Sequence, residues 1–444
     1  MSRPVARPLA AILGLLAGLL GILGTPAPAA ADNVVTPGSF TGYGFDQCLA
    51  PTQKAMNAWL KHSPFLSVGI YISGDSRACR SQPNLTTDWI STQLRKGWRL
   101  LPITLGPQAS CSTRFPRYGD DETIIPRPGK AGKYRPARRQ GRAEAVSAVA
   151  AAKKLGIVPG STLWYDLEGF DHTNRHCRES ALSFLSAWTT KLHELDYVSG
   201  VYSSVGSGIK ALDDARVERP QAYVMPDAIW LARWDGVANT SSSYIREDGW
   251  RPGGRVKQYR GGHDETWGGV RINIDSNYLD LGKGSWAAPE THCDGVPVDL
   301  TNYKPVKPAT TATDRVRALQ CLLTEKGVYD GKLSGAYSPN TIEAVHAWQD
   351  QRGLPTSDVF TRTAWMTLVA AGPRAIVKFG SAGPEVRRVQ RALNAASKGA
   401  QLEVTGVFTG PTDKALRAYQ ARVGITVSGV AAPNTWTALR TGTR

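Results

Sequence analysis

Two carboxylates stand two residues apart in the otherwise apolar run 163–169. This run predicts a β-strand, in which residues i and i+2 face the same side, so Asp166 and Glu168 would point together and Gly169 would end the strand. Burying two acids on one face is costly unless they are paired or hydrogen-bonded. Enzymes accept this cost when one carboxyl must act as an acid while the other stays ionised, and glycoside hydrolysis needs such a pair. The alternative is a surface strand end with two solvated acids.

Short apolar strands alternate with helices from residue 40 to about 281. Strands are expected at 43–46, 66–72, 99–105, 162–168, 199–203, 228–233, 255–259 and 271–274. Helical spacing links Ala181, Leu185, Trp188, Leu192 and Leu195, and a second helix is expected at 87–96. This α/β pattern predicts a TIM-like (β/α) barrel. The connections near 244–254 and 261–269 are short and glycine-rich, so we expect the last helices to be incomplete.

In such a barrel the chemistry lies at the C-terminal ends of the strands. Four acids are expected at these ends, and we predict them as the catalytic group: Asp46, Asp166, Glu168 and Asp275. The polar and aromatic residues predicted to bind substrate beside them are Tyr202, Arg233, Trp234, Gln258, Tyr259 and Asn277. Capping of helix N-termini accounts for one or two of these acids but is a poor explanation of all four.

The N-terminal segment 1–31 predicts a secretory signal. Arg3 and Arg7 precede an apolar stretch at 9–23, and a Pro/Ala-rich exit ends at about Ala31. A transmembrane anchor is the alternative, but the exit segment and the absence of a basic stop-transfer flank oppose it. We therefore expect a secreted, extracellular or wall-associated monomer that leaves the membrane after signal cleavage.

The chain is strongly basic, with a formal net charge of +16. Loss of Arg3 and Arg7 with the signal leaves +14. Such an exported protein meets anionic surfaces, for example wall polymers or acidic lipids, whereas nucleic acid is not expected as its partner. Part of the charge lies in 127–142, which has no acid and several glycines and prolines, and which therefore predicts a solvated loop.

The six cysteines favour disulfides, because an even count in an exported chain is typical of a disulfide framework. Cys293–Cys321 is expected because this pair flanks a linker. Cys79–Cys111 is expected because each follows one of two neighbouring strands, and Cys48–Cys177 then remains by subtraction. No CxxC pair occurs in the sequence, so a zinc ribbon is not expected.

A proline-containing segment without periodicity, 289–312, predicts a linker between the barrel domain, 38–288, and an internal repeat of about seventy residues. The first copy is placed at 313–371 and the second at 376–444. Val316-Arg317-Ala318-Leu319-Gln320 corresponds to Val386-Arg387-Arg388-Val389-Gln390, and Thr363-Ala364-Trp365 corresponds to Asn434-Thr435-Trp436. Each copy is expected to be a small three-helix, all-α domain that binds rather than catalyses.

The repeats resemble the peptidoglycan-binding domain of bacterial wall hydrolases. The residues that carry this resemblance are the V-x-x-[LV]-Q segments, the turn that begins with Asp330-Gly331, the A-x-x-x-[WY]-Q helices and the final T-W-x-x-L. The second copy has Val404-Thr405-Gly406 in place of the Asp-Gly turn. The resemblance implies peptidoglycan or another wall glycan as the partner.

The region 40–281 resembles the muramidases of bacteria and phages, glycoside hydrolase family 25. It is closer still to the glycoside hydrolase-like domain of exported wall-associated proteins, which opens with the same G-F-D-x-C. The matching segments, in order, are Gly44-Phe45-Asp46, Tyr165-Asp166-Leu167-Glu168, Val201-Tyr202-Ser203, Trp230-Leu231-Ala232-Arg233-Trp234, Lys257-Gln258-Tyr259 and Ile274-Asp275-Ser276-Asn277.

We accordingly expect Glu168 to be the general acid, with a pKa raised by its neighbours and partial burial. Asp166 is expected to stay ionised and to stabilise the reacting sugar or orient its N-acetyl group, while Asp46 and Asp275 tune both. No cofactor or metal is expected. The alternatives are a non-catalytic wall-binding protein or scaffold on the same barrel, and a zinc-dependent amidase that uses His172 and His176 near Asp171.

Overall fold

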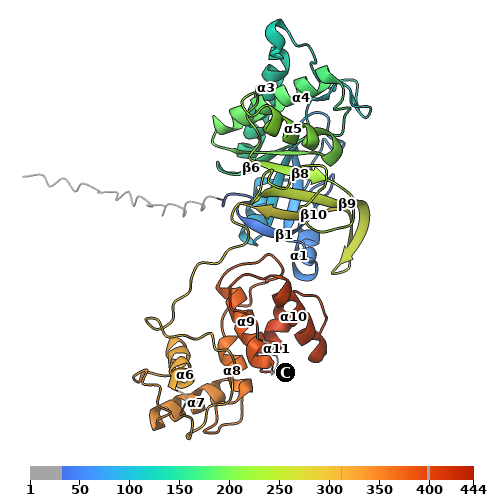
Figure 1. Cartoon of the computed structure of the whole chain (residues 1–444). Coiled ribbons are helices and arrows are strands. Elements are labelled where there is room, and N and C mark those ends of the chain that lie inside the picture. Colours follow the sequence, from blue (N-terminus) through green and yellow to red (C-terminus); the bar gives the residue numbers. More distant parts are fainter. Residues whose placement is uncertain (1–32, 312, 398–400) are drawn as a thin grey trace, which may run out of the picture. The chain divides into compact units, whose positions relative to one another are not determined.

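The computed structural model describes residues 33–311, 313–397 and 401–444 (Figure 1). The predicted secretory signal at 1–31 lies outside the described residues. Within the described ranges, no helix is both long enough and apolar enough to cross a bilayer.

Eight strands of the described chain close into a barrel in the order β1-β10-β9-β8-β7-β6-β3-β2, which confirms the predicted TIM-like architecture. The barrel strands are β1 (Phe40–Asp46), β2 (Ser67–Ser73), β3 (Arg99–Thr104), β6 (Thr162–Asp166), β7 (Val198–Ser204), β8 (Ala228–Ala232), β9 (Gly254–Trp267) and β10 (Val270–Leu281). The helices around them are α1 (Gln53–His62), α2 (Thr87–Arg95), α3 (Arg135–Lys154), α4 (Arg175–His193) and α5 (Lys210–Glu218). Figure 1 shows α3, α4 and α5 grouped on one side of the barrel.

The alternation of side chains along β6 determines what reaches the barrel interior. Tyr165 points outward and packs against Phe184 and Trp188 of α4. Trp164 faces the other way and meets Trp230 of β8 edge-on, with ring centroids 5.5 Å apart. Asp166 shares the inward direction of Trp164, because residues two apart lie on the same face of a strand. The apolar core therefore ends in a carboxyl group at the C-terminal end of β6.

The last two strands depart from a regular β/α barrel, as the short connections predicted. β10 pairs antiparallel with both β9 and β1, whereas β1–β2–β3–β6–β7–β8–β9 are joined by parallel pairings. Gly268 and Gly269 form the two-residue turn between β9 and β10, both with positive φ, as a tight hairpin requires. The two strands are much longer than the predicted 255–259 and 271–274, because the hairpin pairing continues beyond the barrel.

A folded loop takes the place of a helix between β8 and β9. The guanidinium of Arg255, which is fully buried, lies at its centre. It donates to the carbonyl oxygens of Gly249 (2.6 Å), Arg246 (2.7 Å), Glu247 (3.1 Å) and Thr240 (3.3 Å). One side chain thus supplies the donors that a helix would have supplied through its backbone.

Replacing Arg255 by methionine is expected to destabilise the barrel by about 3 kcal/mol or more, because several buried carbonyl groups lose their donor. Protease cleavage should then appear within 240–249 before the rest of the barrel is cut. Limited proteolysis followed by mass spectrometry measures this effect. Arg260→Met, an exposed change on the same strand, is the matched control and should behave like the wild type.

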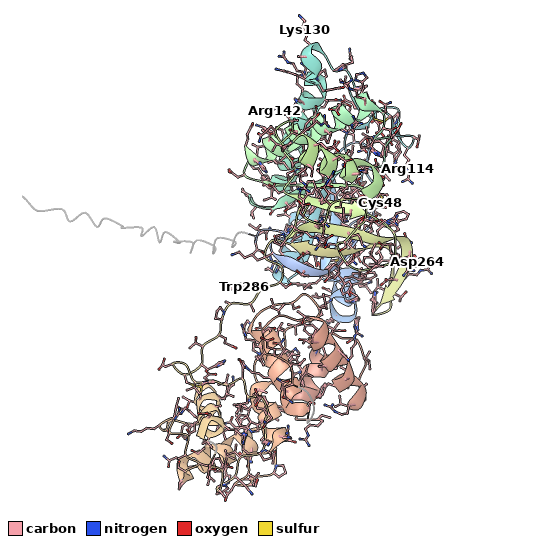
Figure 2. The ribbon with its side chains drawn as sticks, viewed as in Figure 1. Cys48, Arg114, Lys130, Arg142, Asp264 and Trp286 are labelled. Atoms are coloured by element: carbon pink, nitrogen blue, oxygen red, sulfur yellow. A yellow bond between two sulfur atoms is a disulfide. The ribbon has the colours of Figure 1, made fainter. Side chains whose placement is uncertain are left out.

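The basic segment 127–142 is only partly the solvated loop that the sequence suggested. Helix α3 begins at Arg135, with Pro136 in its first turn. Ala137 and Gly141 are buried, and a Cβ on Gly141 would lie 2.2 Å from the carbonyl oxygen of Phe184 in α4. Close packing of α3 on α4 therefore overrides the loop signal from residue 135 onward. The preceding loop does project outward, and Figure 2 shows Lys130 at its tip.

Three disulfides are present, and one of them, Cys293–Cys321, was correctly predicted. The other two expected pairs were wrong: the bonds are Cys48–Cys79 and Cys111–Cys177. Cys48 and Cys79 follow the adjacent parallel strands β1 and β2. After β3 the chain turns away through the short strand β4 (Gln108–Ala109), which pairs with β5 (Thr123–Ile124) and brings Cys111 to the first turn of α4.

The C-terminal region consists of two three-helix units: α6 (Thr313–Glu325), α7 (Pro339–Gln351) and α8 (Arg362–Val369), then α9 (Pro384–Ala396), α10 (Gly410–Arg422) and α11 (Pro433–Arg440). The two copies also share equivalent side-chain hydrogen bonds. Gln320 accepts from the backbone N–H of Gly335 and donates to Thr341, and Gln390 makes the same bonds with Gly406 and Thr412. The repeated glutamines therefore hold the fold.

Part of the segment 289–312, predicted as a linker, is packed rather than free. Tyr303 and Val306 are fully buried against the first helical unit. Val306 pairs with Phe360 in an isolated β-bridge, and the indole of Trp365 donates to the carbonyl of Lys304 at 3.1 Å.

Candidate active site

Asp46 lies on the floor of the barrel mouth at the end of β1 and is 4% exposed. Asn277 Nδ2 donates to its Oδ1 at 2.6 Å, and Gln258 Nε2 lies 3.3 Å from each carboxyl oxygen. Burial, followed by the charge of Asp275, raises the pKa of Asp46 to about 8, while the two amides oppose the shift. With this pKa, the carboxyl of Asp46 is mostly protonated at neutral pH.

The amides beside Asp46 are fixed in turn by aromatic side chains. Trp230 Nε1 donates to Asn277 Oδ1 at 2.8 Å. Gln258 Oε1 accepts from the Tyr202 hydroxyl at 3.0 Å and from Trp234 Nε1 at 2.9 Å. Because each amide oxygen already accepts from an aromatic donor, each amide nitrogen must point to Asp46. Gln258 and Asn277 therefore lie beneath the mouth and position Asp46.

Asp275 lies at the mouth, but the strand that carries it differs from the one predicted. The sequence placed it just after a strand at 271–274, but it lies in the middle of the antiparallel strand β10, directly opposite Asp46. Its carboxylate accepts from the backbone N–H of Gly262. Burial raises the pKa of Asp275, and this backbone donor opposes the shift.

Asp166 and Glu168 differ in exposure although they are only two residues apart. Asp166 ends β6 and is 2% exposed, while Glu168 lies beyond the strand with 22% of its side chain exposed. Burial, and then the charge of Glu168, raises the pKa of Asp166 well above its usual range. This contradicts the expectation that Asp166 stays ionised, because its burial disfavours the charged form.

Tyr71 and Gln108 hold this pair, and sequence reasoning missed both. The Tyr71 hydroxyl donates to Asp166 Oδ2 at 3.1 Å. Gln108 Nε2 donates to the Asp166 carbonyl at 2.8 Å, and its Oε1 accepts from the Glu168 backbone N–H at 2.9 Å. Tyr71 lies within β2, and Gln108 lies in the two-residue strand β4 after β3, so neither carried a motif. Asp166 Oδ1 is buried and has no hydrogen-bond partner among the described residues.

Glu168 stands where two clefts meet. A cleft of about 490 Å³ extends on one side along Tyr202, Arg233, Trp234 and Tyr244. A smaller cleft of about 190 Å³ on the other side contains Asp46, Asp275 and Tyr71. Glu168 lines both clefts and is therefore accessible from either side. Figure 2 labels two residues of these clefts, Arg114 and Cys48.

Only some of the other residues predicted to bind substrate line one of the two clefts. Tyr202, Arg233 and Trp234 line the larger cleft, and Trp234 is 64% exposed. Tyr259 lines neither cleft, because it follows the inward-facing Gln258 on β9 and points to the opposite face.

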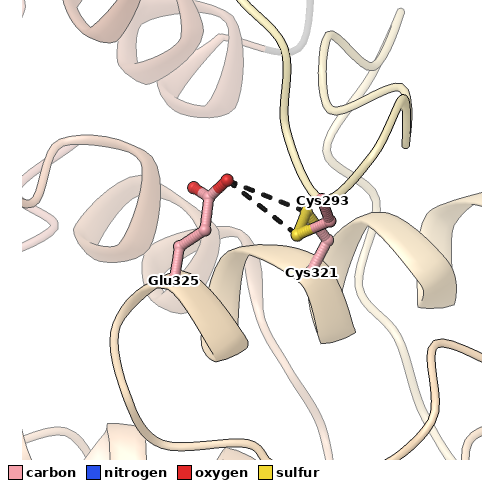
Figure 3. A group of neighbouring side chains, drawn as sticks. All are labelled: Cys293, Cys321 and Glu325. Carbon is pink, nitrogen blue, oxygen red and sulfur yellow. Dashed lines mark hydrogen bonds between the residues drawn. A yellow bond between two sulfur atoms is a disulfide. The ribbon is translucent and has the colours of Figure 1, made fainter.

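One of the two histidines considered for a metal is engaged elsewhere. His176 Nδ1 lies 2.7 Å from the Tyr134 hydroxyl. Within the described ranges, one cluster of three potential ligands occurs, Cys293, Cys321 and Glu325. Figure 3 shows that its two sulfur atoms are bonded to each other, and a disulfide sulfur is not the thiolate that binds metals.

Comparison with known families agrees with this architecture. The model of the Rv2525c-like, glycoside hydrolase-like domain matches residues 57–279, half of the chain. The chain belongs to this family. The model of a putative peptidoglycan binding domain matches twice, at 312–367 and 382–439, which confirms the predicted repeat. This member of the Rv2525c-like family therefore combines a glycoside hydrolase-like domain with two peptidoglycan-binding repeats. It also contains three disulfides.

Two solved structures show weaker likeness. An uncharacterized protein of B. stearothermophilus is 19% identical, with a TM-score of 0.34, over 54% of this chain and 95% of its own. The modular autolysin LytC of Streptococcus pneumoniae is 13% identical, with a TM-score of 0.33, over 54% of this chain and 46% of its own. None of the curated proteins matches the chain.

Proposed function

We propose that this protein is an exported glycoside hydrolase that cleaves peptidoglycan or a related wall glycan, and that its C-terminal repeats anchor it to the wall. One observation carries the proposal: a partly exposed carboxyl, Glu168, lies at the junction of two clefts, above buried acids with raised pKa values. Carboxyl groups in such contrasting environments are the usual means of acid catalysis at neutral pH.

In this mechanism Glu168 protonates the glycosidic oxygen as the C–O bond breaks, and a water molecule supplies the oxygen that replaces it on the sugar. Asp166 lies beside Glu168 at the end of β6, lines neither cleft and is held by the Tyr71 hydroxyl, so its buried carboxyl supports Glu168 rather than touching the sugar. Asp46 and Asp275 keep the floor of the mouth polar. Trp234 and Tyr202 supply ring faces for stacking on the sugars.

The test is the release of reducing ends from purified peptidoglycan by the protein with intact disulfides. Release that persists in EDTA supports the proposal. Release of free amino groups that EDTA abolishes would indicate a metal-dependent amidase. If no reducing ends appear although the protein sediments with wall material, the barrel is a binding module.

A further inference from the structure

The larger cleft carries a net positive charge at its rim. The charged residues that line it are Arg114, Arg233 and Glu168. A neutral sugar needs hydrogen-bond partners and a stacking face but gains little from two guanidinium groups. Guanidinium groups match planar oxyanions, to which they can donate two parallel hydrogen bonds.

Arg114 is available for a ligand. Its side chain is 72% exposed, and its Nη1 lies 3.7 Å from Glu168 Oε2, beyond hydrogen-bonding distance. No other ion pair of Arg114 occurs among the described residues. Its donors can therefore turn to a bound anion without breaking a bond within the protein.

Arg233 is oriented by stacking rather than by an acid. Its guanidinium carbon lies 5.1 Å from the centroid of Tyr244, and it forms no salt bridge with any described residue. Tyr244 belongs to the loop anchored by Arg255. The stacking leaves the edge of the guanidinium, which bears the N–H groups, open to the cleft.

The exposed indole of Trp234 provides the adjoining surface. Its Nε1 is fixed by Gln258 Oε1 at 2.9 Å, and a Cβ on Gly261 would lie 2.3 Å from its Cε2, so the ring rests on the β9 backbone. One ring face is covered in this way, while the residue as a whole is 64% exposed. The indole of Trp234 thus offers one fixed, exposed face beside Arg114 and Arg233. A sugar ring with an anionic substituent could stack on this face while the arginines bind the anion.

The smaller cleft does not offer the same groups. Its two arginines are tied to the loop after β2: Arg77 Nε donates to the Gly74 carbonyl at 2.7 Å, and Arg117 Nη1 to the Ser76 carbonyl at 3.1 Å. This cleft also contains Asp46 and Asp275. The described cleft arginines whose guanidinium groups make no hydrogen bond within the protein, Arg114 and Arg233, therefore lie on the Trp234 side of Glu168.

We infer that the sugar unit bound between Trp234 and Arg114 carries a free carboxylate, which Arg114 and Arg233 recognise. This inference rests on the proposed function for the identity of the cleft as a glycan site. It narrows the substrate class to acidic glycans, such as wall strands whose lactyl carboxyl groups are no longer joined to peptides.

The test measures binding rather than turnover, with Glu168→Gln as the background in the full chain so that cleavage does not interfere. The probe is a short peptide-free peptidoglycan oligosaccharide with free carboxyl groups, compared with the same oligosaccharide after carbodiimide amidation. We expect the acidic form to bind about tenfold tighter for each arginine engaged. Arg114→Gln and Arg233→Gln should each remove about tenfold of this preference, and Arg139→Gln, an exposed change of equal charge on α3, should remove none.

Equal affinity for the two oligosaccharides, or a preference that both cleft variants retain, would overturn the inference and leave the result on cleavage unaffected. A third probe, poly(glycerol phosphate), distinguishes the anion. If it binds more tightly than the acidic oligosaccharide and loses affinity in the two arginine variants, the cleft recognises phosphate and the carboxylate assignment is wrong. The helical repeats contribute equally in all variants, so differences among the variants report on the cleft.

Discussion

Glu168→Gln is expected to reduce the release of reducing ends from peptidoglycan by about a thousandfold, within the range that a general acid contributes. Glutamine has nearly the same shape as glutamate but has no proton to give to the leaving oxygen. The backbone N–H of Glu168 is held by Gln108, so the segment should keep its position in the variant. Binding to wall material should not change, because the C-terminal repeats are untouched.

The measurement pairs a reducing-sugar assay with sedimentation on purified wall. Glu218→Gln, which removes an exposed acid at the end of α5, is the matched control and should retain full activity. Wild-type activity in Glu168→Gln would sink the assignment of this residue. Loss of both activity and wall binding would indicate misfolding, which circular dichroism would detect.

The stability of the barrel is expected to fall as the pH rises from 5 to 8, and Asp46→Asn should make this fall shallower. The pKa of Asp46 is about 8 in the folded chain, against an ordinary value of 3.8. The unfolded chain therefore releases this proton near pH 4, whereas the folded chain holds it until about pH 8. Linkage makes folding less favourable across this window, by about 1.4 kcal/mol for each unit of pH over which only the folded state keeps the proton.

Asparagine carries no charge at any of these pH values, so the variant should be more stable than the wild type at pH 8 and comparable at pH 5. Hydrogen exchange of β1 and β10 at several denaturant concentrations reports on the barrel separately from the helical repeats. Asp350→Asn, an exposed change in the first repeat, should leave the wild-type dependence intact. A dependence in Asp46→Asn as steep as in the wild type would show that Asp46 is not the group that holds the proton.

Asp275 illustrates how the sequence can indicate the right residue for the wrong reason. The short segment 271–274 suggested a parallel strand ending at the mouth, as in a regular barrel. In fact β10 runs antiparallel and passes the mouth, and its register with β1 places Asp275 opposite Asp46. The short, glycine-rich connection at 261–269 predicted an incomplete helix, but the direction of β10 depends on its pairing with β1, which lies far away in the chain.

Asp166 and Glu168 are a second case in which the local sequence was insufficient. The spacing of Asp166 and Glu168 placed both near the mouth, but it did not show which would be buried. Asp166 shares the inward face of Trp164 and is enclosed by Tyr71 and Gln108, while Glu168 lies past the end of the strand. Burial depends on these distant elements, so protonation could not be inferred from local sequence.

The sequence by itself determined the barrel, the repeats and the four acids, because strand alternation, helical periodicity and repeated motifs are local patterns that survive without knowledge of neighbours. Only the tertiary structure decided the pairing of Cys48 and Cys79, the antiparallel closure through β10 and the proton held by Asp46. It also decided that Gln258 and Asn277 support the floor while Arg114 faces the cleft. Each of these depends on contacts between segments far apart in the chain, and no local pattern records such contacts.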